Sequence, residues 1–238
     1  MEPAHIGAGN PLRVLSAGSV RAALLTAAQA YNAKTGCAFT FTFDTAGGVE
    51  KRAGAEAPDV FASSMDSLRK LEASGLLGGP ARAVGSARMA LGVRTGERAP
   101  DISTVEAFKA AVRGARKIAR GDPAGGGTGA IHLLEVFTRL GLFDEVAAKS
   151  VLRVGGVNVM RAVAEGLADF GITQSTEIVP VKGVEIAAWL PDEIQSVTAY
   201  GVAAGAKSAQ PGKVRDFLAW LAAPEAARLF AEAGFFPA

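Results

Sequence analysis

The chain has 238 residues, of which 49% are hydrophobic and 20% charged, a composition typical of a folded globular protein. Its 25 basic and 23 acidic residues are spread evenly and give a net charge of +2, which argues against a nucleic-acid surface. The one cysteine excludes an intrachain disulfide. No stretch approaches the roughly 20 apolar residues of a membrane span, so we expect no membrane insertion.

The first ten residues, Met1–Asn10, are polar or small and lack the basic and apolar regions of a signal peptide. We expect them to form a tail ahead of the first strand. Two interpretations of the location stay open. The chain is either a mature periplasmic protein whose signal peptide has been removed, or a cytoplasmic protein if the chain as given is complete.

The first 80 residues alternate strand and helix three times. The predicted strands are Leu12–Ser16, Phe39–Phe43 and Asp59–Ala62. Each is followed by a helical pattern, the last of them Met65–Ser74. That rhythm predicts a parallel sheet with right-handed crossovers.

The pattern changes at Arg82–Arg94, a long uninterrupted segment that we expect to cross between two lobes. Ser103 and Glu106 have the spacing of a capping box at the start of the next helix. The further predicted strands are Lys117–Arg120, Val151–Val154, Phe170–Thr176, Val184–Leu190 and Val197–Ala203, the last returning to the first lobe. Two C-terminal helices follow, Lys213–Ala222 and Pro224–Ala233.

The predicted fold class is therefore α/β with two lobes, each a mostly parallel sheet flanked by helices, and two crossing segments as a hinge. Residues 1–84 and 201–238 are predicted to form the first lobe and residues 85–200 the second. We expect a ligand cleft between them.

Four strand-to-helix junctions are rich in Ser, Thr and Gly, at residues 16–19, 45–48, 125–129 and 173–177. Parallel sheets bind ligands at the carboxyl ends of their strands, where helix N-termini offer free N–H groups and a positive dipole end. The four junctions together predict an anion-binding site. Each junction taken alone has a structural alternative, a tight turn with an N-cap.

Nucleotide, metal and cofactor sites are not indicated. A phosphate-binding loop requires a Lys after its glycines, and none follows the glycine run at 121–129. The run also lacks the later acidic residue of a dinucleotide site. The two histidines, His5 and His132, do not form a metal-ligating cluster. No Gly-x-Ser-x-Gly elbow is present.

The order of these pieces resembles the molybdate-binding proteins of ABC importers and their type II periplasmic substrate-binding relatives. The stretches that carry the resemblance are Val14–Val20, Ala57–Ala62, Arg120–Pro123, Gly166–Ile172 and Phe217–Ala226. The resemblance implies a two-lobed periplasmic-binding-protein fold, a small anionic ligand, an importer membrane subunit as partner, and a monomer.

The resemblance also implies ligand contacts through hydroxyls and backbone amides. The residues that match are Ser19, Thr45, Ala46, Gly47, Thr128, Gly129, Gln174 and Ser175. Two of them depart from the family: Ala46 replaces a serine, and Gln174 replaces a tyrosine. Both changes remove hydroxyl donors suited to a tetrahedral oxyanion, and an amide that donates and accepts suits a carboxylic acid better.

Arg120 ends a predicted strand just before the glycines, where its guanidinium would anchor a carboxylate. The alternative for Arg120 is a surface salt bridge.

One branch of the resemblance is similar to aconitate isomerase, an enzyme that moves a proton along a small polycarboxylic acid. In that alternative His132 or Glu177 would supply the base; otherwise His132 is structural and Glu177 orients its loop. A third alternative is a cytoplasmic ligand-sensing module.

Overall fold

The computed structural model describes residues 3–237 and divides into two compact units. Unit 1 comprises Met1–Ser86 and Thr198–Ala238, and unit 2 comprises Ala87–Val197. The chain passes from one unit to the other within β5 (Arg82–Arg94) and returns within β10 (Val197–Ala204).

The sheet of unit 1 has the strand order β1-β3-β2-β4-β10. Its other strands are β1 (Ala4–Ile6), β2 (Leu12–Ala17), β3 (Phe39–Asp44) and β4 (Val60–Ser64). The three strands β2, β3 and β4 run parallel, whereas β1 pairs antiparallel with β3 and β10 pairs antiparallel with β4. The parallel centre follows from the repeated strand–helix rhythm of this part of the sequence.

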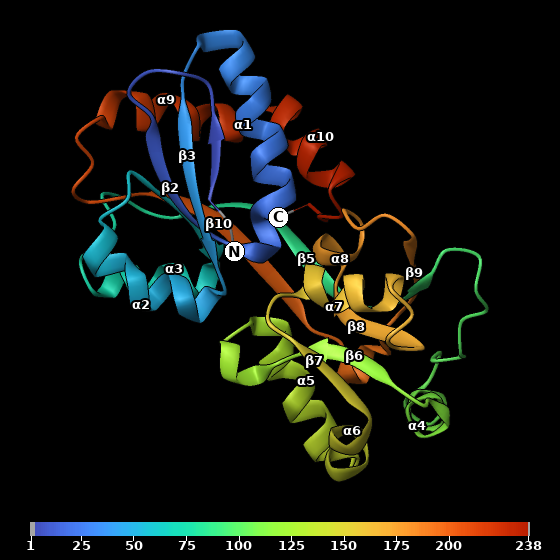
Figure 1. Cartoon of the computed structure of the whole chain (residues 1–238). Helices are drawn as coiled ribbons and strands as arrows, with labels where there is room; N and C mark the ends of the chain where they lie inside the picture. The colour runs from blue at the N-terminus through green and yellow to red at the C-terminus, as the bar shows by residue number, and fades with distance from the viewer. Residues whose placement is uncertain (1–2, 238) are drawn as a thin grey trace. The chain divides into compact units, whose positions relative to one another are not determined.

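Helices cover both faces of this sheet (Figure 1). One face carries α1 (Arg21–Thr35), α9 (Pro211–Leu221) and α10 (Pro224–Glu232), and the other carries α2 (Ala46–Glu56) and α3 (Met65–Ala73). The alternating phenylalanines of β3 are buried, and the ring of Phe39 lies 4.7 Å from that of Phe217 on α9. The period of two in β3 therefore packs one face of the sheet against these helices.

The sheet of unit 2 has the strand order β5-β8-β6-β7, with β9 also paired to β5. Its other strands are β6 (Ile118–Gly121), β7 (Ser150–Arg153), β8 (Phe170–Gln174) and β9 (Val184–Trp189). Strands β7, β6 and β8 run parallel, and β5 pairs antiparallel with β8 and β9. The predicted fold class, α/β with sheets flanked by helices, is confirmed.

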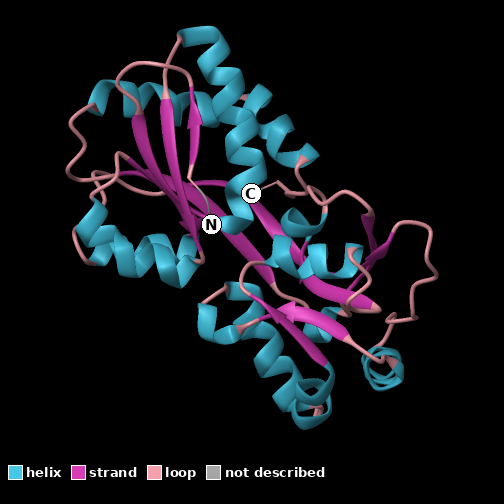
Figure 2. Ribbon diagram, in the orientation of Figure 1, coloured by secondary structure: helices cyan, strands magenta, loops and turns pink. Residues whose placement is uncertain are grey.

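Two separate apolar cores lie on the two faces of the second sheet. One core packs α4 (Val105–Gly114), α5 (Thr128–Arg139) and α6 (Phe143–Lys149), and the other packs α7 (Gly156–Ala164) and α8 (Ser175–Ile178). Figure 2 shows these helices in cyan around the magenta strands. Short 3₁₀ turns complete the fold: η1 (Gly18–Val20), η2 (Pro123–Gly125) and η3 (Asp192–Ile194).

One aspartate fixes the start of the parallel strands in each unit. The buried carboxylate of Asp59 accepts from the backbone N–H of Arg13, at 2.8 Å, and from the hydroxyl of Ser208. Asp169 accepts from the backbone N–H groups of Arg116 and Lys117, at 2.7 and 3.2 Å. Each carboxylate satisfies backbone donors at the amino end of a neighbouring strand.

Three details differ from the sequence-based expectation. The predicted N-terminal tail contains β1, in which His5 pairs with Thr40 of β3. The helix α6 was not predicted, because it is only seven residues long. The cap of α4 is Thr104, whose hydroxyl accepts from the N–H of Ala107, and not Ser103.

Within the described part of the chain, no helix is both long enough and apolar enough to cross a membrane.

We predict that Asp169→Asn lowers the free energy of unfolding by about 1–2 kcal/mol at pH 7, since hydrogen bonds from two backbone amides to a carboxylate are weakened. Burial alone would raise the pKa of Asp169, but the backbone amides and guanidinium of Arg116 and the amide of Lys117 hold it below its ordinary value. The carboxylate therefore stabilises the fold above the unfolded pKa of about 4, and this stabilisation is lost as the pH falls through the folded pKa.

Urea unfolding of both proteins at pH 7 and at successively lower pH measures the effect. The difference is expected to shrink below about pH 4. Asp192→Asn is the control, because the Asp192 side chain is 95% exposed. If the difference in the free energy of unfolding between Asp169→Asn and the wild type does not change with pH, the stabilising role assigned to the ionised Asp169 carboxylate is contradicted.

Candidate functional site

The predicted junctions of unit 1 lie along one edge of its sheet. The ends of β2 and β3 are in register, Ala17 beside Asp44, and Ser16 of β2 pairs with Ala62 of β4. Because these strands are parallel, the segments η1–α1, α2 and α3 all begin at the same edge. The edge therefore brings Ser19, in η1, near the start of α2.

Thr45 is the N-cap of α2. Its hydroxyl oxygen accepts from the N–H of Gly48 at 3.0 Å, and its carbonyl accepts from the N–H of Val49. The first amides of a helix have no partner within the helix, so those of Ala46 and Gly47 are available to a ligand. The Thr45 hydroxyl still has a proton to donate. All three predicted residues of this junction thus offer neutral donors at one place.

A carboxylate also lies at this junction. Asp44 accepts from the N–H of Thr45 at 2.7 Å, and a Cβ added to Gly48 would lie 2.1 Å from its carboxylate oxygen. Arg52 of α2 donates to Asp44 at 3.3 Å and also pairs with Glu56. The charge of Asp44 is therefore balanced locally, and only a glycine fits beside it.

The junctions of unit 2 are arranged in the same way. Strands β7, β6 and β8 are parallel, so α7, α5 and α8 begin at one edge. Gly129, in the first turn of α5, lies against β5 and β8: a Cβ there would be 3.1 Å from Sδ of Met89 and 3.6 Å from Cγ of Gln174. Gln174 and Ser175 are buried at the end of β8. The structure thus brings Thr128, Gly129, Gln174 and Ser175 to one edge.

Glu177 has both carboxylate oxygens engaged. Oε1 accepts from the N–H of Gly156 at 3.0 Å, and Oε2 accepts from the hydroxyl of Thr173 at 2.6 Å. Gly156 is the first residue of α7, where a negative charge is favoured by the helix dipole. A Cβ on Gly156 would lie 2.1 Å from the carboxylate. Glu177 therefore holds α7 against the β8–α8 turn.

His132 is also committed to a backbone group. Its Nε2 lies 2.9 Å from the carbonyl oxygen of Ile194 in η3. Since a carbonyl only accepts, Nε2 carries a proton, and Nδ1 is the acceptor of the neutral ring. Arg139 of the same helix donates to the carbonyl of Glu193 at 3.0 Å. The two side chains hold η3 against α5.

Arg120 is directed away from the edge where the helices begin. Its Nε donates to the hydroxyl of Ser150 at 2.7 Å, and its guanidinium lies 6.0 Å from the Phe137 ring centroid. Phe137 is nine residues beyond Thr128, about 13 Å along the helix. Burial lowers the pKa of Arg120 and Asp122 partly offsets the effect. We therefore do not include Arg120 among the ligand contacts, and it is a buried cation rather than half of a surface salt bridge.

Sequence reasoning missed two features of the unit 1 edge. The first is a third junction at the end of β4, where Ser64 caps α3 and the buried hydroxyl of Ser63 has no hydrogen-bond partner within residues 3–237. The paired serines after an apolar strand were the signal for it. The second is Arg21, the first residue of α1, whose guanidinium lies 4.3 Å from the centroid of the Phe43 ring.

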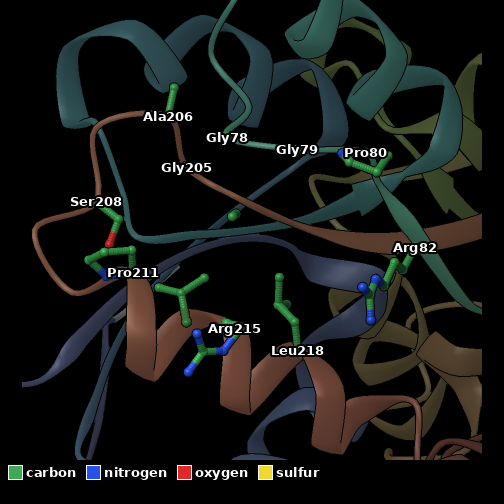
Figure 3. Close-up of a pocket in the computed structure, with 12 residues that line it drawn as sticks. Gly78, Gly79, Pro80, Arg82, Gly205, Ala206, Ser208, Pro211, Arg215 and Leu218 are labelled. Atoms are coloured by element: carbon green, nitrogen blue, oxygen red, sulfur yellow. The ribbon is translucent and has the colours of Figure 1, made fainter.

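A separate pocket of about 340 Å³ lies elsewhere on unit 1 (Figure 3). It is lined by residues that include Gly205, Arg82 and Arg215. Ala204, also at the pocket, pairs with Val60, the first residue of β4. The pocket is therefore at the opposite edge from the junctions. Among the described residues no three His, Cys, Asp or Glu side chains are grouped as a metal site.

Comparison with known families agrees with this arrangement. The family model described as "Bacterial extracellular solute-binding protein" matches residues 12–236, nearly the whole chain. The chain belongs to this family. Open α/β sheets bind ligands outside the carboxyl ends of their strands, which is where the junctions of both units lie.

Individual relatives differ in what they do. The chain is 32% identical to an aconitate isomerase of Pseudomonas sp, over 95% of this chain and 87% of that protein. The periplasmic molybdate-binding protein of Azotobacter vinelandii matches with a TM-score of 0.80 and 21% identity, covering 95% of this chain and 99% of that one. Peb3 from Campylobacter jejuni matches with a TM-score of 0.67 and 16% identity, covering 95% and 100%. At these identities the two structures establish the shared fold.

We predict that Glu177→Gln and Glu177→Ala separate a structural from a catalytic role. A glutamine keeps an oxygen for the Gly156 amide and an N–H group for the Thr173 hydroxyl, whereas alanine leaves a buried amide unpaired, at a cost of about 1–3 kcal/mol. Thermal unfolding should show a clearly lower Tm for alanine than for glutamine, since 1 kcal/mol corresponds to roughly 2–4 °C at this size. Equal Tm values would contradict the structural role.

Proposed function

We propose that the protein binds a small organic carboxylate as the solute-binding component of an ABC importer, outside the cytoplasm, and works as a monomer with an importer membrane subunit as its partner. Membership of the solute-binding family supports the class of function. The observation that supports an anion as ligand is the pair of edges where several helices begin, each with backbone N–H groups and hydroxyl-bearing or amide side chains in its first residues. The proposed contacts are Ser19, Thr45, Ala46, Gly47, Thr128, Gly129, Gln174 and Ser175.

Two residue choices favour a carboxylate over a tetrahedral oxyanion. Ala46 contributes only its amide, and Gln174 offers a carboxamide in place of a hydroxyl. A carboxamide accepts as well as donates, so it pairs with a protonated or hydroxylated part of an organic acid, whereas an oxyanion needs donors alone. The similarity to an aconitate isomerase, a protein named for a tricarboxylic acid, points in the same direction.

We predict that organic acids raise the Tm of the protein and that molybdate, tungstate and sulfate do not. A thermal-shift screen with these ions, citrate, cis-aconitate and trans-aconitate measures this, because a ligand that binds only the folded state stabilises it by mass action. Stabilisation by molybdate and tungstate alone would contradict the carboxylate assignment.

We further predict that Ser19→Ala weakens binding of the best acid by about 1–2 kcal/mol, roughly 5–30-fold in Kd, since one hydrogen bond to a charged group is lost. Isothermal titration calorimetry measures the change. The matched control is Ser74→Ala, because Ser74 follows the last turn of α3, at the far end of that helix from the junctions. Equal Kd values for Ser19→Ala and the wild type would remove Ser19 from the site.

A second candidate function is isomerisation of a small polycarboxylic acid, favoured by the 32% identity to an aconitate isomerase. The reaction needs a base that takes a proton from one carbon of an allylic system and a proton returned to the other carbon. The two predicted bases have structural partners: Glu177 binds Gly156 and Thr173, and Nε2 of His132 binds the carbonyl of Ile194. Glu177 is already committed to holding α7 and the β8–α8 turn, and Nδ1 is the one ring nitrogen of His132 left to take a proton, which is why binding is the first candidate.

Proton NMR of a mixture of the protein with cis-aconitate separates the two functions. As a binding protein it should leave the acid unchanged over many hours at a 1:100 ratio of protein to acid. The isomerase function would be established if the wild-type protein formed trans-aconitate, Ser74→Ala formed it at the same rate, and His132→Gln did not form it.

A further inference from the structure

The pocket of unit 1 shown in Figure 3 is built from three segments of the chain. They are residues 78–82, which end at the first residue of β5, residues 204–208 at the end of β10, and one side of α9. The N–H of Gly78 donates to the carbonyl of Ala204 at 2.9 Å, and a Cβ on Gly78 would lie 3.1 Å from the carbonyl oxygen of Gly205. The first two segments are thus in close contact, and the fold itself fixes these walls of the pocket.

The helix α9 presents a largely apolar face to the pocket. The helix residues that line it have the spacing of one helical face: Pro211, Val214, Arg215 and Leu218. Val214 and Leu218 are buried, and Leu218 extends from the helix toward the pocket in Figure 3. The volume of about 340 Å³ is at the lower end for small-molecule sites. The pocket can therefore bury the apolar body of a small ligand.

The charged side chains that line the pocket are both basic. They are Arg82 and Arg215, and no Asp or Glu is among the described residues that line it. Pro211, the first residue of α9, also lines the pocket, and the first turn of this helix carries no acidic residue. The positive end of the helix dipole therefore lies at the pocket. The helix and the two side chains together favour an anion.

The two arginines differ in how far they are engaged. Arg215 pairs with Asp216 at 3.1 Å, but both side chains are exposed, so water and salt weaken this pair. The side chain of Arg82 makes no hydrogen bond and no ion pair to any of residues 3–237. Arg82 is therefore the cation that a bound anion would engage first.

We propose that this pocket is a second ligand site, for a small amphipathic monocarboxylate. The carboxylate binds the guanidinium of Arg82, whose planar fork matches its two oxygens, and an aromatic or branched aliphatic body packs on Val214 and Leu218. The pocket lies at the edge of the sheet opposite the junctions of unit 1. The inference therefore stands apart from the proposed function, and either can fail without the other.

An NMR titration of the ¹⁵N-labelled protein with 3-phenylpropionate tests the inference. The amide signals of residues 78–82 and 204–208 are expected to shift, with a Kd of about 1 mM or lower for a ligand of roughly ten non-hydrogen atoms. The neutral 3-phenylpropanamide and acetate, which lacks the apolar body, are each expected to bind at least about fivefold more weakly. Arg82→Gln is expected to weaken 3-phenylpropionate by about fivefold or more, since a hydrogen-bonded charge is lost.

The control variant is Arg69→Gln, because Arg69 is an exposed residue of α3 that pairs with Asp66 and does not line the pocket. It should keep the wild-type affinity. Should Arg82→Gln not fold, the comparison of 3-phenylpropionate with its amide still tests the charge on the wild-type protein. Equal affinity for these two compounds, or wild-type affinity in a folded Arg82→Gln, would overturn the inference.

The positions of the shifted signals give a further test. Shifts confined to residues 16–19 and 45–48 would mean that the probe binds only at the junctions, and the second site would be rejected. An absence of shifts at residues 78–82 and 204–208 up to about 10 mM 3-phenylpropionate would reject it as well.

Discussion

Two aspartates at the amino ends of parallel strands support the rest of this structure. Asp59 accepts from the backbone of Arg13, and Asp169 accepts from the backbone of Arg116 and Lys117. Each fixes where neighbouring strands begin relative to one another. Since the strands are parallel, their carboxyl ends then align at the other edge, and every following helix starts there. The two sheets, in units with separate cores, use the same device. The strand register that is set at the amino edge of each sheet therefore determines where the candidate site lies at the opposite, carboxyl edge.

The chemistry of the two edges is mainly that of neutral donors. Hydroxyls and helix-start amides bind an anion without placing a compensating charge of their own, and they act more strongly where water is excluded. The acidic groups nearby are already satisfied: Asp44 by Arg52 and a backbone amide, Glu177 by Gly156 and Thr173. Their charges orient turns and helices. Because these partners partly offset the two negative charges, the carboxylates repel an anionic ligand less than unpaired carboxylates would. In the proposed function, specificity depends on a few side chains, among them Gln174.

The same scaffold serves both receptors and an isomerase among the relatives, so function depends on which side chains are free to react. In this chain a network of backbone contacts engages several of them. Gln195 accepts from the N–H of Met89 and donates to the carbonyls of Met89 and Leu190, while His132 holds the neighbouring Ile194. This network fixes the segment that enters β10. It also fixes Met89, which packs against Gly129. A histidine used in this way contributes rigidity more directly than proton transfer.

The sequence by itself determined the α/β class, the strand–helix order and the positions of the junctions. These features depend on local periodicity: the alternating phenylalanines of β3, for example, can only form a strand with one buried face. The tertiary structure alone decided what individual polar side chains do, because their partners are remote in sequence. Glu177 binds an amide 21 residues earlier, and His132 binds a carbonyl 62 residues later. Arg120 extends toward Ser150 and not toward the start of the helix that follows it, while Arg21 stacks on Phe43 of the next strand. A side chain at a strand end can lean in either direction, and only the packing around it selects one.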